Sequence, residues 1–372
     1  MNQAKIYTAI GLMSGTSLDG VDVALIRTDG EDVVELGASM TLPYDDAFRD
    51  QLRQVLGPAG RATPGAEEAE RALTQRHADL VKAFMQREGL TADDIDVIGF
   101  HGQTVHHDPK NGVTIQLGDG KLLSDELGIP VVGDFRSRDV NSGGEGAPLV
   151  PVFHAALLKS APAIKLPAVV VNIGGVANVT WVGDVDGDIL AFDTGPGNAP
   201  LNDWMCDHVG ESMDSDGAHA AKGAVDEAVL TKALDHAYFD RKPPKSLDRL
   251  DFGAGFVEKL GFEDGAATLT AFIARSVARA AEHFAKPANT WIVTGGGRLN
   301  PVLMGMLEDA VKEYGGADVR SAEAVGWNGD AVEAQAFAYL AVRSQRWLPI
   351  TFPMTTGVAE PLSGGTTNHP GT

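Results

Sequence analysis

The sequence predicts an α/β fold in two domains, and three observations carry that prediction. The chain has 372 residues, more than one hydrophobic core usually organises. Strand-like and helix-like stretches alternate through most of it, which is typical of α/β layering. Residues 167–184 (PAVVVNIGGVANVTWVGD) also repeat the plan of residues 10–26 (IGLMSGTSLDGVDVALI). Each copy runs from an apolar strand through a glycine turn to a second apolar strand.

The first half of the chain begins with strands predicted at 6–12 and 21–26. The turn between them, SGTSLDG, is rich in glycine and small polar residues. Since glycine has no Cβ, the N–H groups of such a turn can approach an anion, with phosphate the obvious candidate. Apolar residues at helical spacing predict a helix over 67–88, and a buried strand follows at 95–100. The remaining predicted elements of this half are a helix at 122–127, a strand at 131–133 and a helix at 149–159.

The second half opens with the repeat and continues with a third strand that ends in ILAFDTGPGN, residues 189–198. Two similar halves, each with one glycine hairpin, would form the two walls of a cleft. Asn198 is expected to cap one helix, and Asn300 with Pro301 to begin another. The tail from Leu348 has few apolar residues and is predicted to be coil on the surface. Further helices are predicted at 226–238, 266–284, 301–314 and 330–345.

Composition and charge restrict the function. A formal net charge of −21 argues against a nucleic-acid or anionic-membrane surface, which needs a basic patch. No apolar run reaches the roughly 18 residues that span a bilayer, and the start, MNQAKIYTAIG, lacks the pattern of a secretion signal. The single cysteine, Cys206, is predicted to be a small buried helix residue and suits a reducing, cytoplasmic location. A phosphate ligand would then be bound by backbone amides, helix ends and a metal.

Glycine turns are the best candidates for nucleotide contacts. Neither a P-loop nor a Rossmann fingerprint occurs, which leaves the two glycine hairpins and the turn TGGGRLN at 294–300. Three consecutive glycines usually meet a geometric need, such as close contact with adenosine or its phosphates. A plain strand-to-helix connection is the alternative for this last turn.

Asp193, in FDTGPGN, is the candidate catalytic carboxylate. It comes where an apolar strand ends, beside Gly195, Gly197 and a predicted helix N-terminus. A carboxylate in that position can act as a general base or hold Mg²⁺ near a phosphate. A simple turn hydrogen bond is the alternative role.

Two other stretches carry candidate sugar contacts. His101 and Gln103, in GFHGQTVHH, have side chains that can bind sugar hydroxyls. Arg136 or Arg138, in DFRSRD, could hold a carboxylate in bidentate fashion. An ion pair with an aspartate of the same stretch is the competing explanation for either arginine.

Together these stretches resemble the successive signatures of the anhydro-N-acetylmuramic acid kinase family. The matching stretches occur in order over residues 10–304, with a further match at 327–341. The resemblance implies an actin, sugar kinase and Hsp70-like fold, with two α/β domains around a nucleotide cleft. Residues 1–135 with 346–372 would form the N-terminal domain, and 136–345 the C-terminal one. The stretches are GLMSGTSLDGVD, GFHGQTVHH, QLGD, DFRSRDV, GGEGAPLVP, NIGGVANVT, FDTGPGN and TGGGRLNPVLM.

The resemblance also implies an activity. The family phosphorylates 1,6-anhydro-N-acetylmuramic acid with ATP and adds water across the anhydro bridge, giving N-acetylmuramic acid 6-phosphate in cell-wall recycling. Asp193 matches the family's catalytic base, and Glu333 matches a glutamate near its active site. Mg²⁺ and a homodimer are implied as well. The alternatives are a kinase of the same fold acting on another hexose or amino sugar, and an ATP-gated clamp of the Hsp70 or actin type.

Individual site residues follow from the motifs and the resemblance together. Asp19 and Asp22 are the candidate metal ligands, and the candidate sugar ligands are His101, Gln103, Arg136, Arg138 and Glu333. The candidate ATP contacts are Gly15, Thr16, Ser17, Leu18, Asp19, Gly20, Val21, Asp22, Gly174, Gly175, Gly195, Gly197, Asn198, Gly295, Gly296 and Gly297.

One loop departs from the family pattern. Where the family commonly reads P-K-S-T-G-R-E, this chain has PPKSLDRLDF at 243–252. Lys245, Ser246 and Arg249 are retained, whereas the Thr-Gly pair is not.

Overall fold

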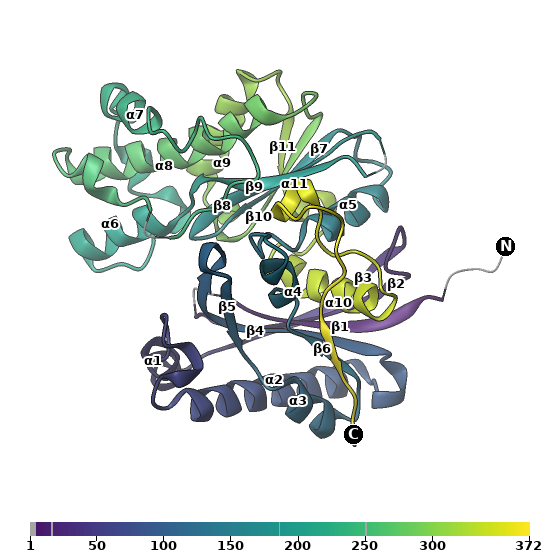
Figure 1. Ribbon diagram of the computed structural model, residues 1–372. Helices are drawn as coiled ribbons and strands as arrows, with labels where there is room; N and C mark the ends of the chain where they lie inside the picture. Colours follow the sequence, from purple (N-terminus) through teal and green to yellow (C-terminus); the bar gives the residue numbers. More distant parts are fainter. Residues whose placement is uncertain (1–4, 16–17, 186, 250) are drawn as a thin grey trace. The chain divides into compact units, whose positions relative to one another are not determined.

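The computed structural model describes residues 5–15, 18–185, 187–249 and 251–372 (Figure 1). The chain divides into two compact units. Unit 1 comprises Met1–Ala161 and Ala331–Thr372, and unit 2 comprises Pro162–Asp330. Unit 1 is therefore assembled from both ends of the chain, and unit 2 is an insertion between them.

Unit 1 is built on a seven-stranded mixed sheet in the order β12-β6-β4-β1-β2-β3, with β5 paired to β4. Strands β1, β2 and β3 form an antiparallel meander, while β4 runs parallel to β1 and β6 runs parallel to β4. The bounds are β1 (Tyr7–Ser14), β2 (Gly20–Thr28), β3 (Val34–Pro43), β4 (Val97–Asp108), β5 (Val113–Leu117), β6 (Val131–Gly133) and β12 (Thr366–Asn368).

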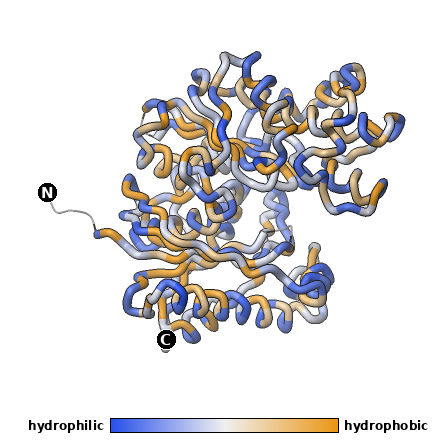
Figure 2. Tube along the Cα trace, turned by 180° about the vertical axis from the view of Figure 1, so that it is seen from behind, coloured by the Kyte–Doolittle hydropathy of each residue, from blue (hydrophilic) through white to orange (hydrophobic). Residues whose placement is uncertain are grey.

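Helices cover both faces of this sheet. The long helix α2 packs its apolar side on one face, where Leu73 and Phe84 meet Leu12 and Ile98. Figure 2 shows α2 as a tube that alternates apolar and polar residues, as expected of an amphipathic helix. Helix α10 packs on β1, β2 and β4. The helices of unit 1 are α1 (Asp46–Gln54), α2 (Ala66–Glu88), α3 (Gly120–Leu127), α4 (Ser137–Asn141), α5 (Pro151–Lys159), α10 (Val332–Gln345) and α11 (Pro353–Thr356).

Two glycines on neighbouring strands let α10 approach the sheet very closely. Gly11 of β1 and Gly99 of β4 are register partners. A Cβ on Gly11 would lie 1.7 Å from the carbonyl oxygen of Ala334, and one on Gly99 would lie 2.0 Å from that of Phe337. The helix backbone thus rests directly on the strand backbones, and side chains at these two positions are excluded.

This packing corrects the predicted domain boundary. The sequence placed residues 136–161 and 331–345 in the C-terminal domain, but both segments lie in unit 1. The reason is that α10 covers β1, β2 and β4, and α5 packs in turn on α10. Helix α10 is consequently buried over almost all of its circumference.

Unit 2 repeats the plan of unit 1 on a five-stranded sheet in the order β11-β10-β7-β8-β9. Strands β7, β8 and β9 form an antiparallel meander, and β10 and β11 add in parallel beside β7. The α/β class and the repeated glycine hairpin are therefore confirmed. The bounds are β7 (Ala168–Ile173), β8 (Val176–Val182), β9 (Ile189–Pro196), β10 (Thr290–Thr294) and β11 (Asp318–Ser321).

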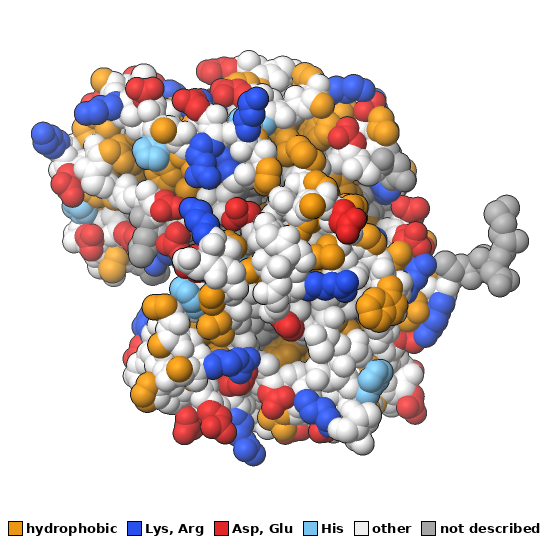
Figure 3. All heavy atoms as spheres, viewed as in Figure 1, with side chains coloured by type: hydrophobic (Ala, Val, Ile, Leu, Met, Phe, Trp, Pro, Cys, Tyr) orange, Lys and Arg blue, Asp and Glu red, His pale blue; other side chains and the backbone are white. Residues whose placement is uncertain are grey.

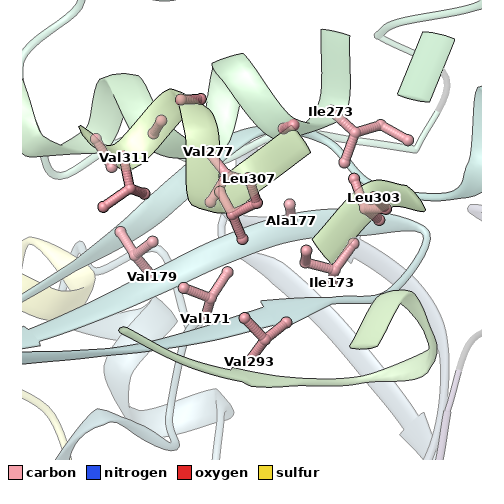
Figure 4. Close-up of a cluster of buried hydrophobic side chains, with 14 of the residues drawn as sticks. Val171, Ile173, Ala177, Val179, Ile273, Val277, Val293, Leu303, Leu307 and Val311 are labelled. Carbon is pink, nitrogen blue, oxygen red and sulfur yellow. The ribbon is translucent and has the colours of Figure 1, made fainter. Parts of the chain in front are cut away.

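The core of unit 2 lies between this sheet and two helices (Figure 4). Val171, Val179 and Val293 project from three strands toward Val277 of α8 and Leu307 of α9. The alternate residues of the same strands point to the opposite face, which is where the polar side chains of the candidate site lie. The helices are α6 (Ala199–Val209), α7 (Glu227–Leu234), α8 (Phe262–Ala278) and α9 (Pro301–Lys312).

Three predictions about local structure were wrong. Strand β4 continues to Asp108, well beyond the predicted 95–100, because its second half pairs with β5. The tail is not plain coil, since it forms α11 and pairs β12 with β6. Cys206 does lie on a helix, but its side chain is exposed because it falls on the outer side of α6.

The surface is mixed in charge. Lys and Arg side chains lie among Asp and Glu side chains on the face shown in Figure 3. Among the described residues, no helix combines the length and the apolar character that crossing a membrane would require.

We predict that Gly99→Ala destabilises the protein by about 1–3 kcal/mol or more, because the new methyl group overpacks the contact between β4 and α10. The measurement is urea unfolding compared with wild type. Gly305→Ala on α9 is the matched control, because an added Cβ there has no atom within 4 Å. The control should be neutral or stabilising. Equal midpoints for Gly99→Ala and wild type would contradict the packing argument.

Acid should loosen unit 1 in particular. Burial lowers the pKa of His77 to about 4 and that of His154 to about 3, and burial with the nearby Arg136 holds the pKa of His101 well below its usual range. The unfolded chain therefore binds these protons first, so stability is complete above about pH 6.5 and falls as the pH drops toward 4. For His77 alone this amounts to roughly 3 kcal/mol.

The check is amide hydrogen exchange between pH 6.5 and 4, in which unit 1 peptides should lose protection. His77→Asn, which keeps a side-chain N–H but does not titrate, should flatten the pH dependence. An unchanged slope in this variant would contradict the assignment.

Candidate functional site

The first glycine turn, between β1 and β2, is fixed by its carbonyl groups. Gln103 Nε2 donates to the Gly15 carbonyl at 3.1 Å, and Arg49 Nε donates to that of Leu18 at 3.1 Å. The Tyr44 N–H donates to the Asp19 carbonyl at 2.9 Å. These three carbonyls therefore face the protein. Thr16 and Ser17, two of the predicted ATP contacts, lie outside the described residues.

Other predicted contacts of this turn have structural roles. Leu18 and Val21 are buried in the core under α2, so they could touch a nucleotide through backbone atoms only. Gly20 is required by packing, since a Cβ there would lie 2.5 Å from the Leu42 carbonyl oxygen. Among the described residues predicted to contact ATP in this turn, Asp19 and Asp22 are those with polar side chains.

The two candidate metal ligands do not form a preformed multidentate site. Asp19 is exposed, and Asp22 accepts a hydrogen bond from Thr41 Oγ1 at 2.5 Å. Among the described residues, no three His, Cys, Asp or Glu side chains are grouped so that they could hold a metal ion. One or two carboxylates still fit Mg²⁺, which in kinases keeps waters and binds the substrate phosphates.

In unit 2 the three predicted glycine turns come together. The N–H groups of Gly197 and Asn198 donate to the carbonyls of Gly175 and Gly174, at 2.9 and 2.7 Å. The turn at 295–297 packs on the end of β7, where a Cβ on Gly295 would lie 2.3 Å from Asn172 Oδ1. Turns that are far apart in the sequence thus lie in contact with one another.

The glycines of these three turns divide into two kinds. Gly195, Gly197, Gly295 and Gly297 are required by internal packing, since an added Cβ would lie 2.2–2.8 Å from a neighbouring atom. Gly174, Gly175 and Gly296 are different, because the nearest atom to an added Cβ is 3.7 or 3.8 Å away. The protein's own packing does not require glycine at these three positions. Open backbone of this kind fits the close approach of a nucleotide.

Asn198 does not act as predicted. It precedes α6, but its side chain makes no capping bond, and Nδ2 donates instead to the Ile173 carbonyl at 3.3 Å. Asn198 therefore joins the turn after β9 to the glycine hairpin between β7 and β8. Asn300 does cap its helix as predicted, accepting from the N–H groups of Val302 and Leu303 at 3.0 Å.

Asp193 lies near the end of β9 and is held on several sides. Its N–H donates to the Lys245 carbonyl at 3.1 Å, and its carbonyl accepts from the Tyr238 hydroxyl at 2.5 Å. Its Oδ2 accepts from the Leu247 N–H at 2.8 Å. A carboxylate oriented by a backbone N–H is suited to accept a proton in a defined direction.

A row of polar residues crosses the sheet beside Asp193. Asn172, Asn178 and Asp193 are aligned by strand register on β7, β8 and β9. Their strand neighbours Val171, Val179 and Phe192 belong to the core under α8 and α9, so the polar row faces the other way. The sequence alone did not identify the two asparagines, because only strand pairing aligns them with Asp193.

In unit 1, three predicted sugar ligands form one cluster. Arg136 Nε and Nη2 donate to His101 Nε2 at 3.1 and 3.0 Å, and Arg136 Nη1 donates to the Gly146 carbonyl at 2.6 Å. Since His101 Nδ1 lies 2.8 Å from the Gly102 carbonyl, the neutral ring carries its proton on Nδ1. Phe337 of α10 packs on the ring at 4.6 Å between centroids.

Charge in this cluster is balanced by Glu333. Burial lowers the pKa of Arg136 to about 10, while Glu333 and Asp139 oppose that shift, so the guanidinium stays charged at neutral pH. Three of its five N–H donors are used by His101 and Gly146. The other two, one on each terminal nitrogen, are the donors that could reach Glu333 or a ligand carboxylate.

Two predicted sugar ligands lie outside this cluster. Gln103 is fully buried and holds the first glycine turn, so it supports the turn and does not present its amide to a sugar. Arg138 is exposed and donates to Ser363 Oγ at 2.9 Å. Gln103 differs from His101 in side-chain direction because the alternation of β4 is interrupted between them, where Gly102 has a positive φ and the pairing with β1 shifts register. Arg138 differs from Arg136 because two residues span more than half a turn of the helix at α4.

Sequence reasoning missed Arg298. Its buried side chain pairs with Glu323 at 2.8 Å and with Asp330 at 2.9 Å, and donates to the Gly295 carbonyl at 3.0 Å. It therefore fixes the triple-glycine turn. Its position immediately after three glycines was the available signal.

Known proteins show where this chain belongs. A family model described as anhydro-N-acetylmuramic acid kinase matches residues 7–369. A protein of that name from Paramagnetospirillum magneticum is 52% identical over 360 residues, covering 96% of this chain and 98% of the relative. One from Rhodospirillum rubrum is 50% identical over 359 residues, covering 96% and 93%.

A solved structure of component A of (R)-2-hydroxyglutaryl-CoA dehydratase from Acidaminococcus fermentans aligns with a TM-score of 0.48 at 12% identity, covering 91% of this chain and 99% of that one. The family match extends over nearly the whole length, through both α/β units. This chain belongs to the anhydro-N-acetylmuramic acid kinase family.

Proposed function

We propose that this protein transfers the γ-phosphoryl group of ATP to 1,6-anhydro-N-acetylmuramic acid while water opens the anhydro bridge. The products are N-acetylmuramic acid 6-phosphate and ADP. Family membership over residues 7–369 supports this activity. The single observation that carries the chemistry is the position of Asp193 near the end of β9, where its Oδ2 accepts a hydrogen bond from the Leu247 N–H.

Asp193 is proposed as the general base. It accepts a proton from water as the water oxygen bonds to the anomeric carbon and the bond from that carbon to the bridging oxygen breaks. The released oxygen then bonds to the γ-phosphorus as the bond to ADP breaks. Because Leu247 holds Oδ2, the carboxylate does not need to reorient during the transfer.

The nucleotide is proposed to contact open backbone. Gly174, Gly175 and Gly296 let N–H groups approach phosphates or adenosine without steric conflict. In unit 1 the turn that contains Gly15 is proposed to bind phosphate, with Asp19 and Asp22 as candidate Mg²⁺ ligands. When bound, Mg²⁺ would offset charge on the phosphoryl group.

The sugar is proposed to meet the cluster of His101, Arg136 and Glu333. A lactyl carboxylate suits the guanidinium, and Glu333 and His101 fix the direction of the remaining N–H donors. We also propose, from the family resemblance, a homodimer that works in the cytoplasm in peptidoglycan recycling.

We predict that Asp193→Asn lowers kcat about 100- to 10,000-fold, because the amide still accepts from Leu247 but cannot take a proton. The measurement is ATP consumption with 1,6-anhydro-N-acetylmuramic acid, with glucose and N-acetylmuramic acid as comparison sugars. The control is Asp184→Asn, which removes only an exposed ion pair with Lys286. Turnover of glucose in place of the anhydro sugar would favour a different hexose kinase. Retained activity in Asp193→Asn would exclude the base assignment.

Arg136→Lys should raise the KM for the anhydro sugar tenfold or more and leave the KM for ATP nearly unchanged, because lysine cannot reproduce the bidentate fork. The effect should disappear with an analogue that lacks the lactyl carboxylate. Arg138→Lys, two residues away and exposed, tests the competing assignment. A larger KM effect at Arg138 than at Arg136 would move the carboxylate contact there.

A further inference from the structure

The segment from Tyr238 to Leu247 surrounds the backbone and carboxylate of Asp193. The Tyr238 hydroxyl, the Lys245 carbonyl and the Leu247 N–H each make a hydrogen bond with Asp193. Every polar group of the Asp193 main chain is thus bound by this one segment. The segment connects α7 with α8 and contains no helix or strand of its own, so something else must fix its shape.

Lys245 supplies that support from inside the segment. Its Nζ donates to the carbonyls of Tyr238 and Phe239, each at 3.2 Å. The same ammonium lies 4.7 Å from the centroid of the Tyr238 ring and 5.4 Å from that of Phe192, the residue before Asp193. One charged group therefore closes the segment on itself and rests against β9.

The energetic cost of this arrangement indicates a role. Lys245 is only 5% exposed, and lysine is almost never buried to this degree without compensation. Burial, with a contribution from Arg279 and Arg241, lowers its pKa to about 8. The burial of the ammonium is compensated by the carbonyls of Tyr238 and Phe239 and by the rings of Tyr238 and Phe192. Tyr238 holds Asp193, Phe239 follows Tyr238 in the chain, and Phe192 precedes Asp193.

We propose that Lys245 is a positioning residue for Asp193, whose ammonium fixes the segment 238–247 that orients the carboxylate. This inference rests on the proposed role of Asp193 as the base. Lys245 itself is not proposed to touch the reacting atoms. Its loss would let the Leu247 N–H and the Tyr238 hydroxyl move, and a misplacement near 1 Å can cost about 100-fold in rate.

The experiment compares kcat and both KM values for Lys245→Met, which keeps the length of the side chain but removes its charge and donors. We expect kcat to fall tenfold or more, with each KM within about threefold of wild type. Lys242→Met, an exposed lysine of the same segment, is the matched control and should behave as wild type. Amide exchange at Leu247 should accelerate in Lys245→Met, while the strands of unit 2 keep their protection.

A second variant covers the case in which Lys245→Met does not fold. Tyr238→Phe removes only the hydroxyl that donates to the Asp193 carbonyl and should give the same selective loss of kcat. The positioning role is overturned if the folded variants keep kcat within twofold, or if only KM values change. That outcome leaves the proposed function intact, because wild type would still turn over the anhydro sugar and Asp193→Asn would not. A wild type that does not turn over the anhydro sugar overturns the proposed function and this inference together.

Discussion

The direct contact of helix α10 with the backbones of β1 and β4 is the constraint on which unit 1 depends. Gly11 and Gly99 are register partners, so their two missing side chains lie side by side and admit the helix. The same helix carries Phe337, which packs on His101, and Glu333, which balances the charge of Arg136. Close packing of two backbones therefore determines where a polar cluster is built, because rigid elements hold its members with little freedom.

Unit 2 achieves similar precision in a different way. Two of its glycine turns are joined by backbone hydrogen bonds, and two of its buried charges, Arg298 and Lys245, each fix a loop. Arg298 holds the turn at 295–297 through a carbonyl and two carboxylates. Lys245 holds the segment around Asp193 through carbonyls and ring faces. Loops are more mobile than helices and strands, and a buried cation with several acceptors restricts them at the cost of desolvation.

The sequence predicted well those features that local signals determine. The long helix α2, the N-cap at Asn300 and the repeated glycine hairpin all follow from spacing and turn chemistry within a few residues. The sequence did not predict side-chain contacts that depend on segments far apart in the chain. Asn198 bonds to Ile173 instead of capping its helix, and Gln103 supports a turn that comes from a different strand. No local pattern records which strand will be the neighbour, so neither contact could be read from the sequence.

The discontinuous composition of unit 1 has a consequence for the nascent chain. Ribosomes release the polypeptide from its N-terminus, so β1, β2 and β4 emerge long before α10, with all of unit 2 in between. Until residue 345 has left the exit tunnel, the sheet face with Gly11 and Gly99 is without its cover. Unit 2 contains all of its own strands and can complete its core first. The part of the protein synthesised earliest is thus the part that finishes folding last, and chaperones that shield apolar surface would act mainly on it.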